Sequence, residues 1–228
     1  MDLTNPWIEI AKETVRDFAL SNDVELIQKY NEGHSKNQIH TELIPLPFIG
    51  NKDAEIVLLN GNPGYDPGDL LFQSDPLVRV MALKNLLHEP MEYPLYLLDP
   101  AIDSPKAGGP KWWRRILRQI IQTYGISERT LANKLFCVEY FPYNSEKFPG
   151  DKYCSIADEY SKWLINSALD RGAFVIIMRC NRRWRARIPR LEGYETCVML
   201  KSCQNVSISK GNFSDESKFS ELVDILRS

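Results

Sequence analysis

Four short runs of apolar residues constrain the fold of this chain more than any other feature of its sequence. They cover residues 54–59, 134–140, 173–178 and 196–200, and each is almost continuously apolar instead of alternating. Such runs are typical of strands covered on both faces of a parallel sheet. Helical patterns separate them, so the sequence predicts an α/β protein with crossover connections.

Capping signals mark where two of the helices begin. Asn5 and Asp75 each precede a proline, and a capping residue followed by proline is a favourable helix start. The first predicted helix would turn Trp7, Val15 and Phe18 inward. The second would run from the cap at residue 75 to residue 87.

Three further helices are expected between and after the apolar runs. Residues 110–124 carry an apolar stripe and end at Gly125, and residues 151–171 repeat this pattern and end at Gly172. Glycine is the residue most often found just past the end of a helix. Residues 215–226 form a last amphipathic segment.

One stretch interrupts this alternation of strands and helices. Residues 88–109 are rich in proline and glycine, and a loop of that length in a compact domain is usually functional or mobile. No repeat or linker is evident. We therefore expect one domain over residues 1–228, with residues 1–50 as an N-terminal helical region packed on it.

Composition excludes several classes of protein. The net charge is −2 with 43% hydrophobic residues, which fits a globular protein and argues against a wholly basic nucleic-acid coat. The five cysteines are odd in number and form no C-x-x-C pair, which favours reduced thiols. No secretory signal or membrane span is evident. We expect a cytoplasmic protein without a membrane partner.

The residues after each strand are the candidates for function, because ligands of parallel sheets bind beyond the carboxyl ends of the strands. After the first run comes Asn60-Gly61-Asn62-Pro63-Gly64-Tyr65-Asp66. Glycine lets the backbone approach a ligand closely. The same residues also suit a plain strand-to-helix turn, so both interpretations stay open. Neither phosphate-loop motif is present.

Aromatic side chains follow the second run, in Glu139-Tyr140-Phe141-Pro142-Tyr143-Asn144-Ser145. Aromatic faces beside short polar side chains could stack a planar base and bond its edge. The alternative is an aromatic core cluster at a proline turn.

Arginine dominates the segment after the third run. Residues 179–190 read RCNRRWRARIPR, with six arginines and no acidic residue. This concentration fits contacts to phosphate. The alternative is a solvated turn in which only Trp184 and Ile188 face inward. Residues 111–115, KWWRR, form a weaker patch of the same kind.

The segment after the fourth run, residues 202–213, carries small polar residues and ends in Lys210-Gly211-Asn212-Phe213. The three histidines lie outside all four of these segments, and neither H-E-x-x-H nor G-x-S-x-G occurs. A metal hydrolase or a serine hydrolase is therefore not expected, and we expect neither a metal nor a cofactor.

Taken together, the four segments resemble the uracil-DNA glycosylase superfamily. Asn62-Pro63-Gly64 matches the N-P-G of its first motif, although Asn60 stands where that motif has a glycine. The superfamily's last motif, H-P-S-P-L-S-x-x-R-G-F, matches Ser207 and Gly211 when laid on residues 202–212. Ser202 then falls where the motif has its histidine.

The resemblance implies a three-layer α/β/α sandwich with a central four-stranded parallel sheet. It also implies a DNA N-glycosylase, a hydrolase that acts on a flipped base. Asn62 would orient water, because an amide oxygen can accept a hydrogen bond but cannot act as a general base. Ser202 would be the second catalytic residue. Asp66 or Glu139 could supply a carboxylate, although neither matches a position of the family.

This hypothesis assigns the remaining candidates to the base or to the nucleic acid. The base-binding residues would be Gly61, Pro63, Gly64, Tyr65, Tyr143 and Asn144. The nucleic-acid contacts would be Arg179, Arg182, Arg183, Arg185, Val206 (as a wedge), Ser207, Lys210 and Gly211. DNA is the partner, and a monomer is the favoured state.

Two alternatives stay open. The same fold could bind a nucleic acid, a nucleobase or a nucleotide without catalysis. The chain could also be an α/β protein that binds a nucleotide or metabolite, with its arginines merely solvated. Convergence of Asn62, Tyr143 and Ser202 on one cleft would favour the glycosylase.

Overall fold

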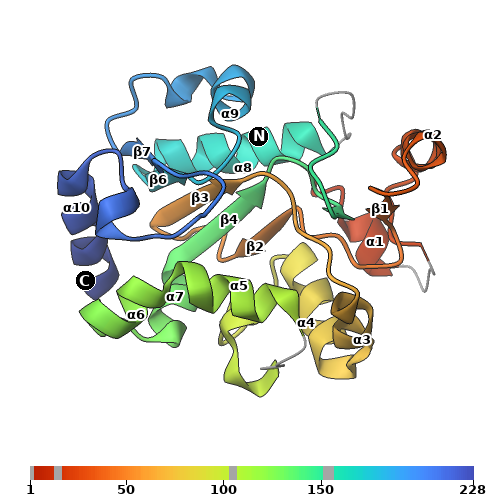
Figure 1. Cartoon of the computed structure of the whole chain (residues 1–228), viewed down its shortest axis with the longest axis horizontal. Helices are drawn as coiled ribbons and strands as arrows, with labels where there is room; N and C mark the ends of the chain where they lie inside the picture. The colour runs from red at the N-terminus through yellow and green to blue at the C-terminus, as the bar shows by residue number, and fades with distance from the viewer. Residues whose placement is uncertain (1–2, 13–16, 103–106, 151–156) are drawn as a thin grey trace.

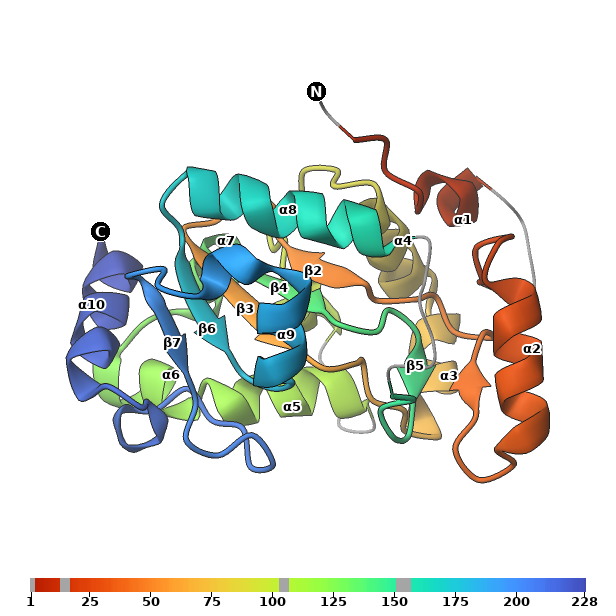
Figure 2. The same cartoon turned by 90° about the horizontal axis from the view of Figure 1, so that it is seen from above.

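The computed structural model describes residues 3–12, 17–102, 107–150 and 157–228. Helices cover both faces of a central sheet (Figure 1), as the α/β prediction requires. In the turned view, α8 (Asp158–Asp170) lies over one face of the sheet, and α5 (Gly108–Ile116) lies on the other (Figure 2). No helix of the described ranges is long and apolar enough to cross a membrane.

The central sheet has five strands in the order β2-β4-β3-β6-β7. Four of them are parallel and coincide with the predicted apolar runs, with β3 extending one residue further, which confirms those strands. They are β3 (Ile56–Asn60), β4 (Leu135–Glu139), β6 (Phe174–Ile177) and β7 (Cys197–Met199). Every residue of β3, β4 and β6 is buried, because helices cover both faces.

The prediction of a wholly parallel, four-stranded sheet is wrong in one respect. A fifth strand, β2 (Phe48–Gly50), pairs with β4 in the antiparallel direction at the edge of the sheet. Three residues after a proline carry too little pattern to predict a strand. Gly50 has φ of 110°, and a Cβ atom there would lie 2.2 Å from the carbonyl oxygen of Leu135. The pairing therefore requires glycine at residue 50.

The predicted signals at helix ends are confirmed at two positions. Asp75 caps α4 (Pro76–Leu86) by accepting hydrogen bonds from the amides of Leu77 and Val78. Gly125 ends α6 (Arg118–Tyr124) in the left-handed conformation, with φ of 69°.

The single helix predicted over residues 110–124 is instead two helices, α5 and α6. They meet at Leu117. The amide of Ile208 donates to the Ile116 carbonyl at 2.8 Å. Because the Ile116 carbonyl bonds a segment far along the chain, the local sequence pattern could not predict the break between the two helices.

The remaining predicted helices differ from the structure mainly at their ends. The first begins at Ile8 as α1 (Ile8–Lys12), with Trp7 and Phe18 buried as predicted, and Val15 lies outside the described residues. The predicted helix over residues 151–171 appears as α8, and residues 151–156 are not described. The last is α10 (Glu216–Arg227).

The predicted long loop is buried in its middle part. Residues 95–98 are all buried, and they include the short helix η1 (Tyr96–Leu98), which a second short helix, η2 (Pro100–Ile102), follows. This segment packs on α5 and α7 (Glu128–Lys134). It forms part of the wall of the cavity described below.

The N-terminal region is tied to the sheet domain by polar contacts. It contains α2 (Val24–Gly33) and β1 (Ile39–His40), and β1 pairs with β5 (Asn144–Ser145). The hydroxyl of Tyr143 donates to Asp23 at 2.7 Å and accepts from the Leu20 amide at 3.1 Å. Tyr143 is fully buried.

Candidate functional site

A cavity of about 320 Å³ lies at the carboxyl ends of three neighbouring strands. Asn60 at the end of β3, Glu139 at the end of β4 and Arg179 just after β6 line it together. The other walls come from the segment after β3, from β5, from η1, from α5 and from α3 (Gly68–Ser74). This is where a parallel sheet is expected to hold a ligand.

Asn62 lines this cavity with its amide group held in one orientation. Its Nδ2 atom donates to the carbonyl oxygens of Pro63 and Ser145, at 3.0 and 3.1 Å, and lies 3.0 Å from the Ser145 hydroxyl. These contacts use the donor side of the amide. The oxygen Oδ1 has no protein donor among the described residues, so it is left to accept a hydrogen bond from a water or a ligand.

Four buried polar atoms in the cavity wall have no hydrogen-bond partner within the described part of the chain. They are Asn60 Oδ1, Glu139 Oε2, Asn144 Oδ1 and Arg179 Nε. Buried polar atoms are nearly always bonded. Four exceptions around one cavity therefore indicate a site that a polar ligand or ordered water completes.

Hydrogen bonds made by other atoms of the same residues fix the orientation of Asn60 and Asn144. Asn60 Nδ2 donates to Glu139 Oε1 at 2.9 Å, and Asn144 Nδ2 donates to the Gly64 carbonyl at 2.9 Å. The Asn60 carbonyl accepts from Trp184 Nε1 at 2.8 Å, which fixes the backbone at this point. The free oxygens of both asparagines thus have defined positions.

Burial changes the protonation of Glu139. The loss of hydration raises the pKa of this carboxyl to about 8, against the opposing effects of the Asn60 hydrogen bond and the Arg179 charge. At pH 7 the carboxyl is therefore mainly neutral in the free protein. Titratable groups with shifted pKa values in a cavity are typical of functional sites.

A second carboxylate lines the cavity from α3. Burial raises the pKa of Asp69 above its usual value, and the nearby Asp66 carboxylate acts in the same direction. Asp69 Oδ2 accepts from the Asp66 amide at 2.8 Å. A carboxylate with a raised pKa is a better proton acceptor than an ordinary one.

Aromatic rings form the other walls of the cavity. Tyr65 stacks on His40 with ring centroids 3.4 Å apart and planes within 3° of parallel. Phe72 of α3 and Trp112 of α5 also line the cavity. Trp112 packs edge-on against Trp113 at 5.0 Å. Such walls suit a flat ring.

Six of the residues predicted from the sequence line this cavity. They are Asn62, Pro63, Gly64, Tyr65, Asn144 and Arg179. Five of the six come from the segments after β3 and β4. The segments after β3 and β4, which the sequence predicted to lie at a ligand site, thus both contribute to the cavity wall.

Three other predictions about the base and the duplex do not agree with the structure. Tyr143 is fully buried and bonds Asp23, so it cannot stack a base in the cavity. Gly61 lies behind the cavity wall, where its carbonyl accepts from the Phe141 amide at 2.9 Å. Val206 has 0% of its surface exposed, so it cannot act as a wedge.

Ser202 does not lie in the cavity wall, and the expected convergence of Asn62, Tyr143 and Ser202 is therefore not found. The Ser202 amide donates to Asn212 Oδ1 at 2.8 Å, and its hydroxyl accepts from the Asn205 amide at 3.2 Å. These contacts shape its own loop. The motif match had placed Ser202 by sequence spacing alone.

The other predicted residues of this loop are also outside the cavity wall. The Ser207 hydroxyl is hydrogen-bonded to that of Ser209 at 3.0 Å. Lys210 lies 3.6 Å from Glu216, and Gly211 belongs to the short helix η4 (Lys210–Asn212). The loop packs through its buried apolar residues Val206 and Ile208.

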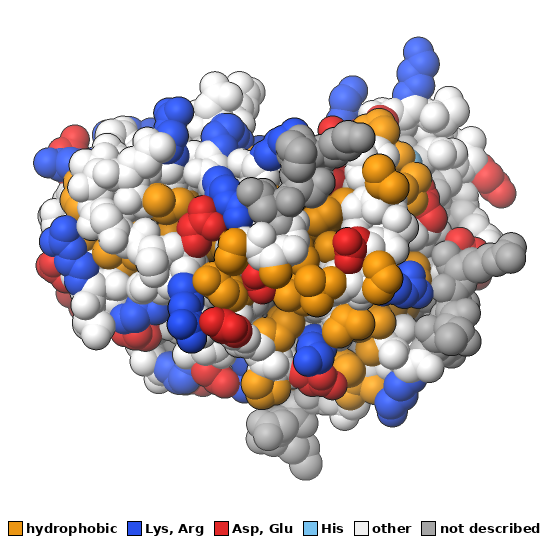
Figure 3. All heavy atoms as spheres, turned by 90° about the horizontal axis from the view of Figure 1, so that it is seen from below, with side chains coloured by type: hydrophobic (Ala, Val, Ile, Leu, Met, Phe, Trp, Pro, Cys, Tyr) orange, Lys and Arg blue, Asp and Glu red, His pale blue; other side chains and the backbone are white. Residues whose placement is uncertain are grey.

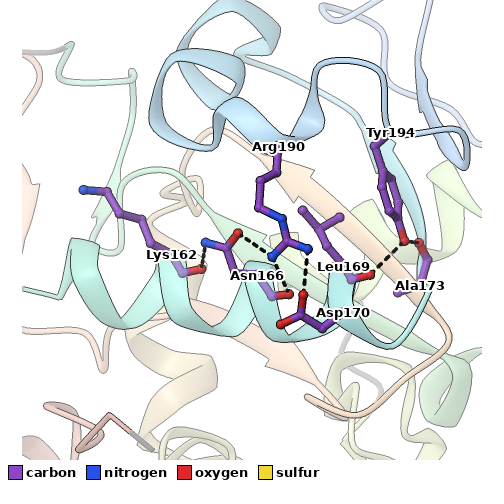
Figure 4. A network of polar contacts seen from close by, with 7 residues as sticks. All are labelled: Lys162, Asn166, Leu169, Asp170, Ala173, Arg190 and Tyr194. Carbon is purple, nitrogen blue, oxygen red and sulfur yellow. Dashed lines mark hydrogen bonds and ion pairs between the residues drawn. The ribbon is translucent and has the colours of Figure 1, made fainter. Parts of the chain in front are cut away.

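Arg185, Arg187 and Arg190 of the cluster form ion pairs with acidic residues of the protein. Arg185 bonds Glu192 at 3.0 Å, and Arg187 bonds the nearly buried Asp158 at 3.0 Å. Figure 4 shows Arg190 reaching α8, where it bonds Asn166 at 3.1 Å and Asp170 at 2.6 Å. These contacts hold α9 (Asn181–Arg187) and the turn after it against α8.

The other three arginines lie in different surroundings. Arg179 lines the cavity. Arg183 lies over the ring of Phe148 at 4.9 Å. Arg182 is exposed. The prediction that the whole cluster contacts phosphate is therefore not supported for Arg185, although a role for Arg179, Arg182 and Arg183 is still a prediction.

The face that carries α3 and α5 is apolar and partly acidic. Figure 3 shows hydrophobic side chains gathered near the centre of this face, with acidic side chains among them. Leu70 and Leu71 of α3 are 42% and 65% exposed. Asp66 and Asp69 precede these two leucines in the sequence. α3 thus presents apolar side chains beside acidic ones, whereas α5 carries the exposed cations Lys111 and Arg115.

Sequence analysis did not assign a site role to Asn60, Asp69, Phe72 or Trp112. Glu139 was named only as a source of a carboxylate. The available signal was a polar residue at the last position of an apolar strand, as in Asn60 and Glu139. Phe72 and Trp112 lie on helices, where an aromatic residue more often belongs to the core.

No group of three or more His, Cys, Asp or Glu that could hold a metal ion occurs among the described residues. No known family, no curated protein and no solved structure matches this chain. The site itself is therefore the basis for a function.

Proposed function

We propose that this chain is a glycosylase-like protein that takes a nucleobase into the cavity and hydrolyses its N-glycosidic bond. The observation that carries this proposal is the convergence of Asn62 with four unpartnered polar atoms in one aromatic-walled cavity. A volume of about 320 Å³ lies within the usual range for small-molecule sites. A uracil-DNA glycosylase-like fold is part of the proposal, because Asn62-Pro63-Gly64 follows β3.

The proposed reaction uses water as the nucleophile. Asn62 Oδ1 accepts a hydrogen bond from the water and directs its oxygen at the sugar carbon C1′. The bond from C1′ to the base nitrogen breaks, and its electron pair stays on the base. Asp69, with its raised pKa, accepts the proton that the water loses.

Arg179 stabilises the departing base in this scheme. The negative charge that develops on the base lies in a cavity with little water, where a fixed positive charge is most effective. Arg179 Nε has no partner among the residues described, so it is free to donate to the base. The neutral Glu139 carboxyl keeps a second negative charge out of the cavity at pH 7.

The direct test is base release from DNA by the purified full chain. Oligonucleotides with uracil, with hypoxanthine, with a mismatch or with normal bases only are incubated with excess protein. Free bases are then measured by chromatography. We expect release from at least one substrate. Absence of any released base at high protein concentration would exclude the hydrolytic proposal.

A second candidate is a protein that binds a nucleobase or nucleotide without catalysis. The position of Ser202 outside the cavity wall favours it, because the superfamily motif places a donor for the leaving base at that residue. Binding of nucleosides without turnover would support this second function.

A further inference from the structure

The His40 side chain of β1 lies against the wall of the cavity. In the antiparallel pair of β1 and β5, His40 is directly opposite Asn144, which lines the cavity. Directly opposite residues of such a pair have their side chains on the same face, with Cβ atoms about 5 Å apart. The face of this small ladder that carries His40 is therefore the face that contributes to the cavity wall.

The His40 ring stacks on Tyr65, which also lines the cavity. The ring centroids are 3.4 Å apart, and the planes differ by 3°. At this distance the rings overlap with almost no offset, whereas aromatic pairs usually prefer an offset or edge-on arrangement. Contacts outside the pair must therefore fix at least one of the two rings.

The ring that other contacts fix is that of His40. Its Nδ1 atom lies 2.7 Å from Glu42 Oε1, and since a carboxylate accepts, Nδ1 donates. The His40 side chain is only 14% exposed, and its backbone is held by the pairing with β5. Tyr65 is half-buried, and its hydroxyl makes no hydrogen bond with the described residues. His40 is thus the fixed ring, and Tyr65 is the ring that it holds.

The backbone just before Tyr65 is held by the same small ladder. Asn144 Nδ2 donates to the Gly64 carbonyl at 2.9 Å, and the Ser145 amide donates to the Pro63 carbonyl at 3.2 Å. These bonds fix the point at which the Tyr65 side chain leaves the backbone. Because His40 covers one face of the ring, the opposite face and the ring edge are left for contact with the cavity.

From this arrangement we infer that His40 is a positioning residue: it holds the Tyr65 ring in one plane, and a nucleobase stacks on the opposite face of that ring. The inference rests on the proposed function, because it takes the ligand of the cavity to be a nucleobase. Every base has a flat π face that can stack on an aromatic side chain. A ring that is ordered before the ligand arrives loses no rotamer freedom on binding, which improves the affinity.

The first experiment removes the His40 ring. Dissociation constants of the full chain for 2′-deoxyadenosine, 2′-deoxyguanosine, 2′-deoxycytidine, 2′-deoxyuridine and thymidine are measured by calorimetry, and the nucleoside that binds most tightly is then used. We expect His40→Ala to weaken its binding about fivefold, because the Tyr65 ring must then be ordered on binding. His40→Phe keeps a flat ring and should restore the native affinity within about twofold. Native affinity in His40→Ala would overturn the inference.

His34 offers a matched control in the same region of the chain. It stacks on Tyr30 of α2 with ring centroids 4.1 Å apart and planes 7° from parallel, and neither residue lines the cavity. We expect His34→Ala to leave the nucleoside affinity unchanged. Equal losses in His34→Ala and His40→Ala would overturn the inference, because the loss would then reflect the N-terminal region in general.

The second experiment tests whether His40 acts through Tyr65. We expect Tyr65→Ala to weaken nucleoside binding about tenfold, as for the removal of an aromatic stacking partner. In the Tyr65→Ala background, His40→Ala should have no further effect, since the energies of two residues that act as a unit do not add. Additive losses, as for a role of His40 in folding alone, would overturn the positioning role.

The outcomes separate this inference from the proposed function. Nucleoside binding that does not respond to Tyr65→Ala would overturn the stacking on Tyr65 and leave a nucleobase site. No binding of any of these nucleosides at millimolar concentration would overturn both. Coupled losses at His40 and Tyr65 without base release would support the inference and leave the non-catalytic function.

Discussion

Asn62 is the residue on which the hydrolytic step depends. Replacing it with alanine removes the oxygen that orients the water, and we expect base release to slow roughly 100-fold. Nucleoside affinity should change far less, since Asn60, Glu139 and Arg179 keep their places in the cavity wall. Single-turnover base release measures the first effect and calorimetry measures the second. The control is the exposed Asn205→Ala, and a similar loss there would point to misfolding.

Glu139 makes folding stability depend on pH. Its pKa is about 8 in the folded chain and near 4.5 in the unfolded chain. Between these values the folded state binds more protons, so stability falls as the pH rises from about 4.5 to about 8.

Replacing Glu139 with glutamine should remove the loss of folding stability at high pH. We expect Glu139→Gln to raise the free energy of unfolding relative to the native protein at pH 9 and to have a smaller effect at pH 5. Urea denaturation at both values measures the difference. A difference that is the same at pH 5 and pH 9 would contradict the buried, proton-binding role.

His88 makes folding stability depend on pH under acidic conditions. It stacks on Phe48 at 4.3 Å, and neither ring nitrogen has a partner among the described residues. Burial lowers its pKa to about 4 from 6.5. Between these values the unfolded chain binds more protons, so folding stability falls by up to roughly 3 kcal/mol as the pH drops from 6.5 to 4.

A ring that does not titrate should remove this dependence. We expect His88→Phe to lose less stability than the native protein between pH 6.5 and pH 4.5, by an amount that thermal unfolding at several pH values can resolve. A difference in backbone strain at φ of 54° does not depend on pH, so it does not affect the comparison of the two pH curves. Parallel pH curves for the two proteins would show that His88 does not titrate in this range.

At the scale of elements, α9 is held by its own arginines. Arg187 bonds Asp158 of α8, donates to the Tyr140 carbonyl at 2.8 Å and lies 3.4 Å from the Tyr140 ring centroid. Its side chain is only 9% exposed. The helix that follows β6 is therefore fastened to two other elements.

Removing this contact should destabilise the fold rather than weaken DNA binding. We expect Arg187→Met to lower the free energy of unfolding by about 2 kcal/mol, because the ion pair with Asp158 and the hydrogen bond to the Tyr140 carbonyl are both lost. The exposed Arg182→Met serves as the matched control and should cost less than about 0.5 kcal/mol. Chemical denaturation compares the two. Equal stabilities would mean that the cluster is held in some other way.

At the scale of the whole molecule, the distribution of charge limits binding to nucleic acid. The chain has a net charge of −2, and Arg185, Arg187 and Arg190 are engaged within the protein. Half of the arginine cluster is therefore not available to phosphates. The cavity, rather than a basic surface, would supply most of the affinity for a substrate.

This balance predicts a weak salt dependence. We expect the logarithm of the affinity for a single-stranded oligonucleotide to fall with the logarithm of salt concentration with a slope no steeper than about −2, as for two or three phosphate contacts. Fluorescence anisotropy titrations between about 50 and 200 mM salt measure the slope. A slope near −5 would indicate an extended basic interface.

The sequence by itself determined the four parallel strands, most of the helices and two of the segments that line the cavity. Continuous apolar runs predict buried strands because burial on two faces leaves no polar position. Asp75 and Gly125 predict helix ends because capping is a local interaction. Asn62, Gly64 and Tyr65 were found because the ligand end of a parallel sheet follows from strand direction alone.

Only the tertiary structure decided which side chains reach the cavity. Tyr143 was lost to a hydroxyl contact with Asp23, 120 residues away along the chain. Arg185, predicted to contact nucleic acid, pairs with Glu192 instead, and Asn60 became a site residue through Glu139 on the next strand. A local pattern predicts which residues can be buried or turned, but the partner that occupies a polar atom comes from a distant part of the chain.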